Sequence, residues 1–424
     1  MSIEHLELEA FRGFSTTTSI SFHPKWTVLA GENGVGKTSI LWALRVLLSH
    51  VIATDRGLGL KRINFAVDDI ANGWPFLRAT VTLHTATQTI QCVGQKNRVK
   101  YIVSPGAQGR PREHASDTPD RYSIKLSTGM KNQTPLVVFY SPHRSVSSER
   151  VGTVARAAGK RNAAYADALV ERQLLLTEAA ALWQKEAELE RTDGVAARAN
   201  RAIEKALPVF LGDFGNLRVE GEDVPRLVVD KRKTTLDLSQ LSDGERGLLT
   251  ILLDLCRRLT AANPKLDEPA KDGHAVVLID ELELHMHPRW QRMIVPCLSK
   301  AFPSCQFVAT THSPQVIGEV QAESLVVLRR DGDHIVPERC GQAFGLDTNY
   351  VLEHILGTAS RAPAAASAIQ KAEESLETGD VQTARMHLKR LRRLLKGGDP
   401  KAIELEATIN SLEALADAQN QEKN

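Results

Sequence analysis

The sequence has few of the features that mark secreted, membrane or disulfide-rich proteins. Its five cysteines are scattered and form no C-x-x-C pair, which indicates reduced thiols rather than a disulfide or zinc framework. No run of about eighteen apolar residues is present, so we expect no membrane-spanning helix. The N-terminus lacks the charged-then-apolar pattern of a signal peptide. We therefore expect a cytoplasmic protein.

The chain also has little excess charge of either sign. A net charge of +2 neither requires nor excludes nucleic-acid binding. Cations gather locally on a predicted helix over 381–396, where a solvated face and a partner contact both remain open. The polar stretch 104–121 predicts an exposed loop, which is a second candidate for partner contacts.

What the sequence does contain is hydrophobic periodicity that changes along its length. A chain of 424 residues can hold two or three domains. Residues 1–150 read as strands with one helix, and residues 151–207 have helical spacing without a sustained heptad. Residues 208–340 return to alternating strands and helices, and residues 341–424 read as short amphipathic helices separated by Gly-Asp turns. The expected fold class is α/β with a helical insert and a small helical C-terminal module.

The first chemical motif is Gly31–Thr38, which fits G-x-x-x-x-G-K-[ST] and lies between a predicted buried strand and a predicted helix. Its glycines let the backbone wrap a phosphate chain, and the N–H groups at the start of the helix point at the anion. Lys37 supplies charge to the β- and γ-phosphates, and Thr38 offers a hydroxyl to Mg²⁺. The expected nucleotide-binding residues of this loop are Gly31, Asn33, Gly34, Gly36, Lys37, Thr38 and Ser39.

The second motif is the apolar strand 276–279 followed by Asp280 and Glu281. Because Asp280 ends a buried strand, we expect it beside the phosphate loop, where it would hold Mg²⁺. Glu281 is placed to orient and deprotonate the attacking water. Glu283 is a nearby carboxylate and a weaker candidate for that role.

The third motif, Leu-Ser-Asp-Gly-Glu at 241–245, precedes an apolar helix. Ser242 is a typical N-cap residue, and an N-cap with open N–H groups is also a phosphate receptor. In this order, the three motifs resemble the ABC-type ATPase superfamily. The resemblance implies ATP and Mg²⁺ as cofactors and a head-to-tail dimer or larger homo-oligomer. In that arrangement Ser242 and Gly244 complete the neighbour's site, and His312 matches the switch histidine that senses the γ-phosphate.

Two details of the sequence indicate which branch of the ABC-type ATPase superfamily the chain resembles. The third motif, which we call the signature, continues as Gly-Glu-Arg at 244–246. The first strand is followed by Phe-Arg-Gly-Phe at 11–14. Both segments look like those of the SMC, RecF and OLD branch. That analogy implies that Arg12 approaches the nucleotide phosphates. The sequence departs from the family after the strand 136–140, where 142–144 reads Pro-His-Arg and no Q-loop glutamine is evident.

Two other sequence patterns suggest a functional site, but we interpret both as structural. His285 and His287 look like a metal pair, yet the OLD-like ATPases have a similar stretch that forms the contact between subunits. The segment 331–333, Asp-Gly-Asp, suggests a Toprim nuclease, but it reads better as a hairpin turn. We expect no nuclease site in this chain.

The segment from Phe344 to Gly357, with the helices that follow, resembles compact anti-phage ATPases of the Septu and retron-associated kind, which are encoded beside an HNH nuclease. The resemblance implies a slow ATPase that regulates an HNH-type nuclease partner in antiviral defence. The alternative is a RecF- or SMC-like ATPase that binds DNA directly in repair or replication, with binding that falls steeply with salt.

Overall fold

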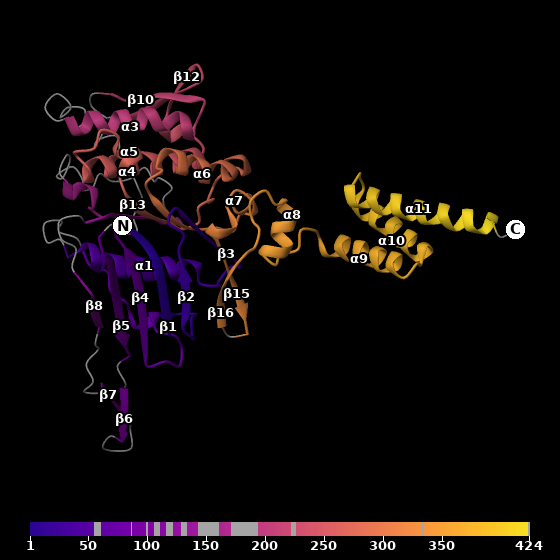
Figure 1. The fold of residues 1–424 in the computed structure, drawn as a ribbon, viewed down its shortest axis with the longest axis horizontal. Coiled ribbons are helices and arrows are strands. Elements are labelled where there is room, and N and C mark those ends of the chain that lie inside the picture. The colour runs from indigo at the N-terminus through magenta and orange to yellow at the C-terminus, as the bar shows by residue number, and fades with distance from the viewer. Residues whose placement is uncertain are drawn as a thin grey trace. The chain divides into compact units, whose positions relative to one another are not determined.

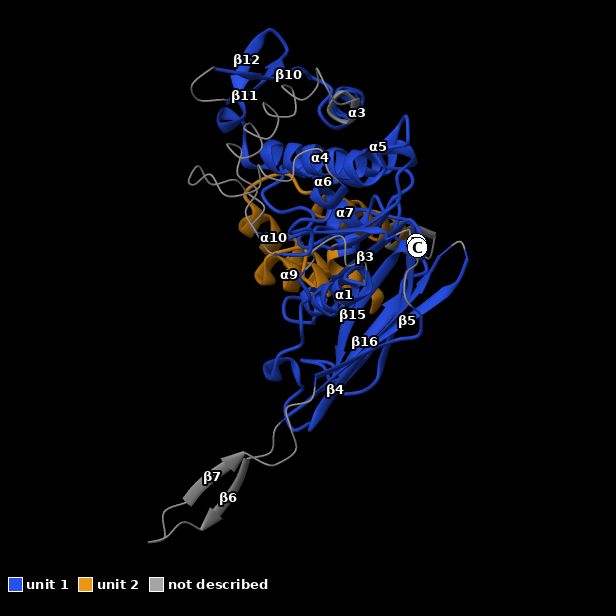
Figure 2. Cartoon of the chain, turned by 90° about the vertical axis from the view of Figure 1, so that its left-hand side faces the viewer, with its two compact units in different colours: residues 1–351 blue, residues 352–424 orange. Residues whose placement is uncertain are grey.

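The computed structural model describes residues 1–54, 61–85, 87–98, 101–105, 111–115, 122–128, 134–142, 161–170, 194–221, 226–332 and 334–422. These residues fall into two compact units, 1–351 and 352–424, which Figure 2 colours blue and orange. No described helix is both long enough and apolar enough to cross a membrane.

A six-stranded sheet with the order β16-β15-β3-β14-β13-β9 forms the centre of the first unit. Neighbouring strands pair in parallel from β15 to β9, and β16 adds an antiparallel edge. Every residue of β3, β9, β13 and β14 is buried, as expected of parallel strands covered on both faces. The strands are β3 (Trp26–Gly31), β9 (Leu136–Tyr140), β13 (Ala275–Ile279), β14 (Gln306–Thr310), β15 (Leu325–Asp331) and β16 (His334–Arg339).

A second sheet, β2-β1-β4-β5-β8, is antiparallel throughout. Its strands are β1 (Ser2–Glu9), β2 (Thr18–Ser21), β4 (Phe76–His84), β5 (Thr89–Asn97) and β8 (Tyr122–Leu126). Helix α1 (Lys37–Ile52) shares one apolar cluster with residues of both sheets. Strands β1 and β2 form an antiparallel pair, and β3 follows them in the chain.

Three helices, α4 (Asp243–Ala262), α5 (Pro269–Asp272) and α6 (Pro288–Ala301), lie between the central sheet and α3 (Gly194–Phe210) in Figure 1. The buried Arg258 of α4 donates to Asp254 at 2.7 Å and to the carbonyl of Ala164 at 2.7 Å. It thereby fixes η5 against α4. The remaining short elements are η2 (Val67–Asp69), η5 (Arg161–Ala164), η6 (Leu238–Gln240), α7 (Pro314–Ile317), η7 (Ala322–Ser324), α8 (Thr348–Tyr350) and the π-helix η8 (Val351–Ile355).

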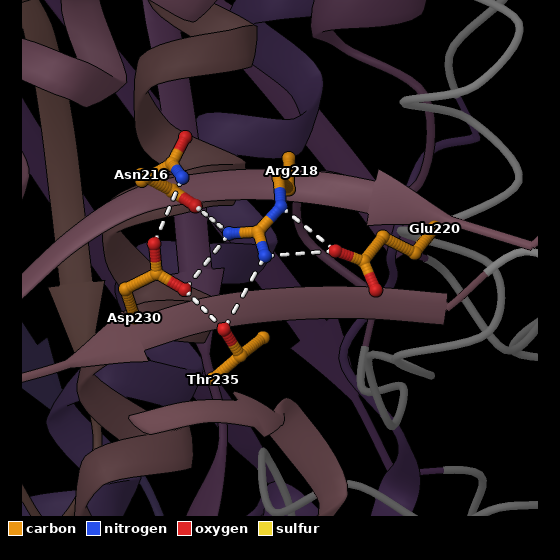
Figure 3. A network of polar contacts seen from close by, with 5 residues as sticks. All are labelled: Asn216, Arg218, Glu220, Asp230 and Thr235. Carbon is orange, nitrogen blue, oxygen red and sulfur yellow. Dashed lines mark hydrogen bonds and ion pairs between the residues drawn. The ribbon is translucent and has the colours of Figure 1, made fainter. Parts of the chain in front are cut away.

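A third sheet, β10 (Phe214–Glu220), β11 (Arg226–Lys231) and β12 (Thr234–Asp237), leads into the 241–245 segment. The pairing of β10 with β11 shifts between Gly215 and Arg218. Figure 3 shows the polar network at this shift: Arg218 donates to Asp230 at 2.9 Å and Thr235 donates to the same carboxylate at 2.7 Å. These hydrogen bonds, with one from Asn216, lower the pKa of Asp230 to about 2. The network holds the strands together where the ladder is interrupted.

The structure differs from the sequence-based expectation in the stretch 104–121. We predicted a loop there, but the backbone forms an antiparallel pair, β6 (Tyr101–Pro105) and β7 (Pro111–Ala115). The rest of that stretch lies outside the described residues. Of the predicted helical insert 151–207, the structure describes 161–170 and 194–207, and α3 continues past its end to Phe210.

The second unit contains α9 (Pro363–Glu377), α10 (Val381–Leu395) and α11 (Pro400–Glu422), as the amphipathic pattern predicts. Their core is built from alanine, leucine and isoleucine side chains of all three helices. Part of the basic face of α10 is used inside this bundle. Arg385 pairs with Glu413 and Arg392 pairs with Glu406, both on α11.

Candidate functional site

The predicted phosphate loop follows β3 and ends in the first turn of α1. Gly36 is the residue before the helix and has a left-handed backbone with φ of 88°. A Cβ at this position would lie 2.8 Å from ring atoms of Phe14, so a side chain is excluded by both conformation and space. Asn33 is exposed, and a Cβ at Gly34 would meet no atom within 4 Å, which leaves the middle of the loop open.

Lys37 is buried, with its side chain folded back along this loop. Its Nζ donates to the carbonyl oxygens of Gly31 at 2.9 Å and Glu32 at 2.7 Å. Burial lowers the pKa of Lys37 to about 8, although the nearby carboxylates of Glu283, Asp280 and Glu281 oppose that shift. A desolvated cation of this kind gains strongly from contact with a polyanion.

Asp280 and Thr38 lie in contact, because β13 and β3 flank β14 in one parallel sheet and end at the same edge. The hydroxyl of Thr38 donates to Asp280 Oδ1 at 3.2 Å, and Thr310 donates to the same oxygen at 2.6 Å. Asp280 is 2% exposed. A hydroxyl beside a carboxylate suits Mg²⁺, which prefers hard oxygen ligands and few protein contacts. Among the described residues there is no group of three or more acidic, histidine or cysteine side chains that would provide a metal site by itself.

Glu281, the next residue, has an unusual backbone. Its φ of 49° lies in the left-handed region, which is uncommon for a side chain of this size. Its N–H donates to the hydroxyl of Thr310 at 2.8 Å, so the strained turn is tied to β14. Such strain costs about 1–3 kcal/mol and persists where surrounding contacts fix it, often at functional sites.

His312 follows β14, two residues after Thr310, and is partly buried. Burial and the positive charge of Lys37 lower its pKa, so its imidazole is neutral at neutral pH. The backbone N–H of His312 donates to a carboxylate oxygen of Glu283. The loop that carries the imidazole is thereby held next to the turn that follows β13.

Arg12 reaches the first turn of α1. Its Nε donates to Asp69 at 2.8 Å, and its Nη1 lies 3.4 Å from the hydroxyl of Ser39. Trp42 donates to the other oxygen of Asp69 at 3.1 Å, and the Arg12 guanidinium lies 5.5 Å from the Trp42 ring. Arg12 is thus held at the helix that the phosphate loop opens.

Ser242 and Gly244 belong to a separate surface at the start of α4. Ser242 is the N-cap and forms a capping box with Glu245, which Lys231 holds at 2.8 Å. Gly244 faces the turn after Glu281: a Cβ there would lie 2.8 Å from the carbonyl oxygen of His285. The recorded side-chain hydrogen bonds of Ser242 go to Glu245, and none joins it to the phosphate loop of its own chain.

The sequence matches two family models, and the fold matches solved structures. A family model described as "AAA ATPase domain" matches residues 1–91, and one described as "AAA domain, putative AbiEii toxin, Type IV TA system" matches residues 158–318. Among solved structures, an SMC head bound to the C-winged helix domain of ScpA covers 80% of this chain and 98% of its own, at a TM-score of 0.52 and 13% identity. The chain has the fold of the SMC heads.

The chain is also similar in sequence to two kinds of bacterial protein. It is 37% identical over 169 residues to a retron Ec83 probable ATPase of Escherichia coli, covering 40% of this chain and 30% of that protein. It is 25% identical over 350 residues to a Septu protein PtuA of Bacillus mycoides, covering 78% of this chain and 41% of that protein. The chain therefore spans less than half the length of these relatives.

Three other features predicted from the sequence have different outcomes. Strands β15 and β16 pair as the predicted hairpin, with Asp331 paired to His334, and residue 333 lies outside the described residues. His287 caps α6 by accepting from the N–H of Arg289. The departure from a Q-loop at 142–144 lies mostly outside the described residues, since Pro142 is the last one before a gap.

Sequence reasoning gave no role to several residues that organise the candidate site. Thr310 contacts both Asp280 and the backbone of Glu281, and Asp69 fixes Arg12. Phe14 underlies Gly36. Only the spatial adjacency of distant segments reveals these roles.

Proposed function

We propose that this chain is the ATP-binding and ATP-hydrolysing regulatory subunit of a bacterial anti-phage defence system. In this proposal two copies close around ATP and control an associated HNH-type nuclease. The supporting observation is the contact of 3.2 Å between Thr38 and Asp280, which unites the phosphate loop with the acidic strand. Together with the buried Lys37, this contact gives a site for a nucleoside triphosphate and its metal.

The binding step follows from the chemistry of the phosphate loop. The loop N–H groups and the N-terminus of α1 favour an anion. The Lys37 ammonium would exchange its two carbonyl partners for phosphate oxygens. Arg12, fixed by Asp69 beside Ser39, would add a second positive charge at the start of α1. Thr38 and Asp280 are the residues that would hold Mg²⁺, which supplies charge neutralisation for the phosphates when bound.

The hydrolytic step would be carried by Glu281 and His312. Glu281 would accept a proton from water while the water oxygen forms a bond to the γ-phosphorus and the bond to the β-bridging oxygen breaks. His312, neutral because its pKa is lowered, can donate an N–H to a γ-phosphate oxygen without adding charge. We expect slow turnover, since the complete site forms only when two subunits meet.

The proposed dimer follows from the second surface. The start of α4 carries an N-cap hydroxyl and helix N–H groups, which together receive phosphate oxygens. Because the described hydrogen bonds of the Ser242 hydroxyl lie within its own capping box, the ligand proposed for it is the nucleotide of another copy. The similarity to a retron probable ATPase and to a Septu protein PtuA supports the defence role.

The substitution Glu281→Gln tests the catalytic assignment. It removes the base without changing size, so ATP binding should persist while kcat falls by about 100-fold or more. Measurements are ATP affinity, phosphate release and protection of cells against phage infection. The matched control is Glu319→Gln, an acidic residue whose recorded contact is with Arg292 at 3.6 Å. Unchanged turnover in Glu281→Gln would rule out this base.

Direct DNA binding is the second candidate function. It is favoured by α10, where Lys389, Arg390 and Arg393 are exposed and have no recorded ion pair within the described residues. If these cations contact DNA phosphates, binding to a duplex should weaken steeply between 50 and 200 mM salt. Absent or salt-insensitive DNA binding by the purified chain favours the nuclease-regulating role instead.

A further inference from the structure

Glu283 is a carboxylate of the site that the proposed hydrolysis does not use. It follows the acidic strand β13 and is partly buried. Both of its carboxylate oxygens are occupied by the loop after β14: Oε2 accepts from the hydroxyl of Thr311 at 2.7 Å, and Oε1 accepts from the backbone N–H of His312. Hydrogen bonds to a carboxylate are stronger than those between neutral groups. Glu283 therefore holds the residue that carries the imidazole.

The neighbouring hydrogen bonds join the same two loops at an earlier point. The N–H of Leu282 donates to the carbonyl of Thr310 at 2.9 Å, and the N–H of Glu281 donates to the hydroxyl of Thr310 at 2.8 Å. These bonds fix the end of β14 but stop two residues before His312. Within the described residues, the side chain of Glu283 is the recorded contact that extends this connection to the backbone of His312.

The backbone of Glu283 begins the turn that faces the signature helix. The N–H of Met286 donates to the carbonyl of Glu283 at 2.9 Å, and His285 between them has a left-handed φ of 61°. This turn directs the carbonyl of His285 toward Gly244, where a Cβ would lie 2.8 Å from the oxygen. Glu283 thus contacts the loop of His312 through its side chain, and its backbone begins the turn that packs against the start of α4.

We propose that Glu283 is a positioning residue that couples contact between His312 and the γ-phosphate to the placement of the signature helix α4 of the same chain. This inference rests on the proposed function and adds how the two surfaces of one copy communicate. When a triphosphate occupies the phosphate loop of one subunit, His312 of that subunit contacts it. Glu283 transmits this contact to the start of α4. The position of Ser242 toward the neighbouring copy changes as a result.

The test compares ATP with ADP in Glu283→Ala, Glu283→Gln and Thr311→Val, with Glu319→Gln as the matched control. Glu283→Ala removes both hydrogen bonds between Glu283 and the loop of His312. Glu283→Gln and Thr311→Val each remove one of them. We expect the preference for ATP over ADP to fall about tenfold in Glu283→Ala, within the usual range for coupling between sites. Glu283→Gln and Thr311→Val should give intermediate losses. ATP-driven dimerisation in a Glu281→Gln background should weaken in parallel.

A double variant separates coupling from a general structural effect. If Glu283 acts through His312, Glu283→Ala combined with His312→Ala should lose no more ATP preference than His312→Ala does. Additive losses, or an equal loss of ATP and ADP affinity in Glu283→Ala, Glu283→Gln and Thr311→Val, would overturn the inference. If the unmodified chain fails to bind or hydrolyse MgATP, the proposed function fails. If it hydrolyses MgATP and the Glu283 variants behave like Glu319→Gln, the inference alone fails.

Discussion

The Lys37 ammonium lies in a buried pocket where two carbonyl oxygens replace water as its hydrogen-bond partners. Desolvation disfavours its charged form, and the carboxylates of Glu283, Asp280 and Glu281 recover part of that loss. The ammonium form therefore predominates at pH 7 and is lost as the pH rises through about 8. This balance makes nucleotide binding sensitive to pH in a definite direction.

The pH dependence of nucleotide affinity follows from this lowered pKa. The ammonium form binds phosphate, and with a pKa of about 8 the free protein loses that form as pH rises through 8. If the bound state keeps the proton, the dissociation constant for ADP should rise roughly eightfold between pH 7.5 and 9. A Lys37→Arg variant keeps its charge, so whatever affinity it retains should stay flat over this range. A flat profile for the unmodified chain would contradict the account.

The sequence alone predicted the residues whose chemical role follows from a local motif. Lys37, Thr38 and Asp280 were assigned from strand ends and a glycine loop, and the structure brings all three to one edge of the sheet. Glu283 was named as a weaker candidate for the base, whereas its contacts lie with the loop of His312. Those contacts depend on β13 and β14 being neighbours, which no local pattern reports.

At the scale of elements, the start of α4 and the turn after β13 fit each other closely. Helix α4 is stabilised by a capping box at Ser242 and by buried residues along most of its length. Its second residue, Gly244, lies against the backbone of the turn at His285 and Met286. A side chain larger than hydrogen would push these two elements apart.

The substitutions Gly244→Ala and Gly247→Ala separate this packing from helix propensity. Gly244→Ala places a Cβ 2.8 Å from a backbone oxygen and should cost about 1–3 kcal/mol of unfolding free energy. Gly247→Ala in the same helix meets no atom within 4 Å and should raise stability by about 0.5–1 kcal/mol. Urea unfolding measures both values. Equal effects of the two substitutions would show that the contact has no energetic weight.

Element prediction succeeded where burial is complete and failed where it is not. The apolar runs that became β3, β9 and β13 were recognised because strands buried on both faces lack alternation. The strands β6 and β7 were missed because their polar, proline-containing sequence has the composition of a loop. Strand order was not predictable, since β9 pairs with β13 across more than a hundred residues of chain.

At the scale of the whole molecule, the predicted halves 1–150 and 208–340 combine into one sheet. Strands β3 and β9 come from the first half, and β13, β14 and β15 from the second, so neither half has a complete core alone. The C-terminal module was predicted from residue 341, and the second compact unit begins at 352. The segment between these numbers has a turn and short helices but lacks the alanine- and leucine-rich pattern of the bundle core.

The central claim is that one copy supplies the phosphate loop and another supplies the signature surface. Two inactive variants, Lys37→Ala and Ser242→Asp, test this claim when mixed. Aspartate keeps the N-cap of α4 but opposes the charge of a triphosphate. Each variant alone should hydrolyse almost no ATP. A mixed dimer contains one intact site, so an equal mixture should recover about a quarter of the unmodified activity. Full activity of Ser242→Asp alone, or no recovery on mixing, would contradict the account.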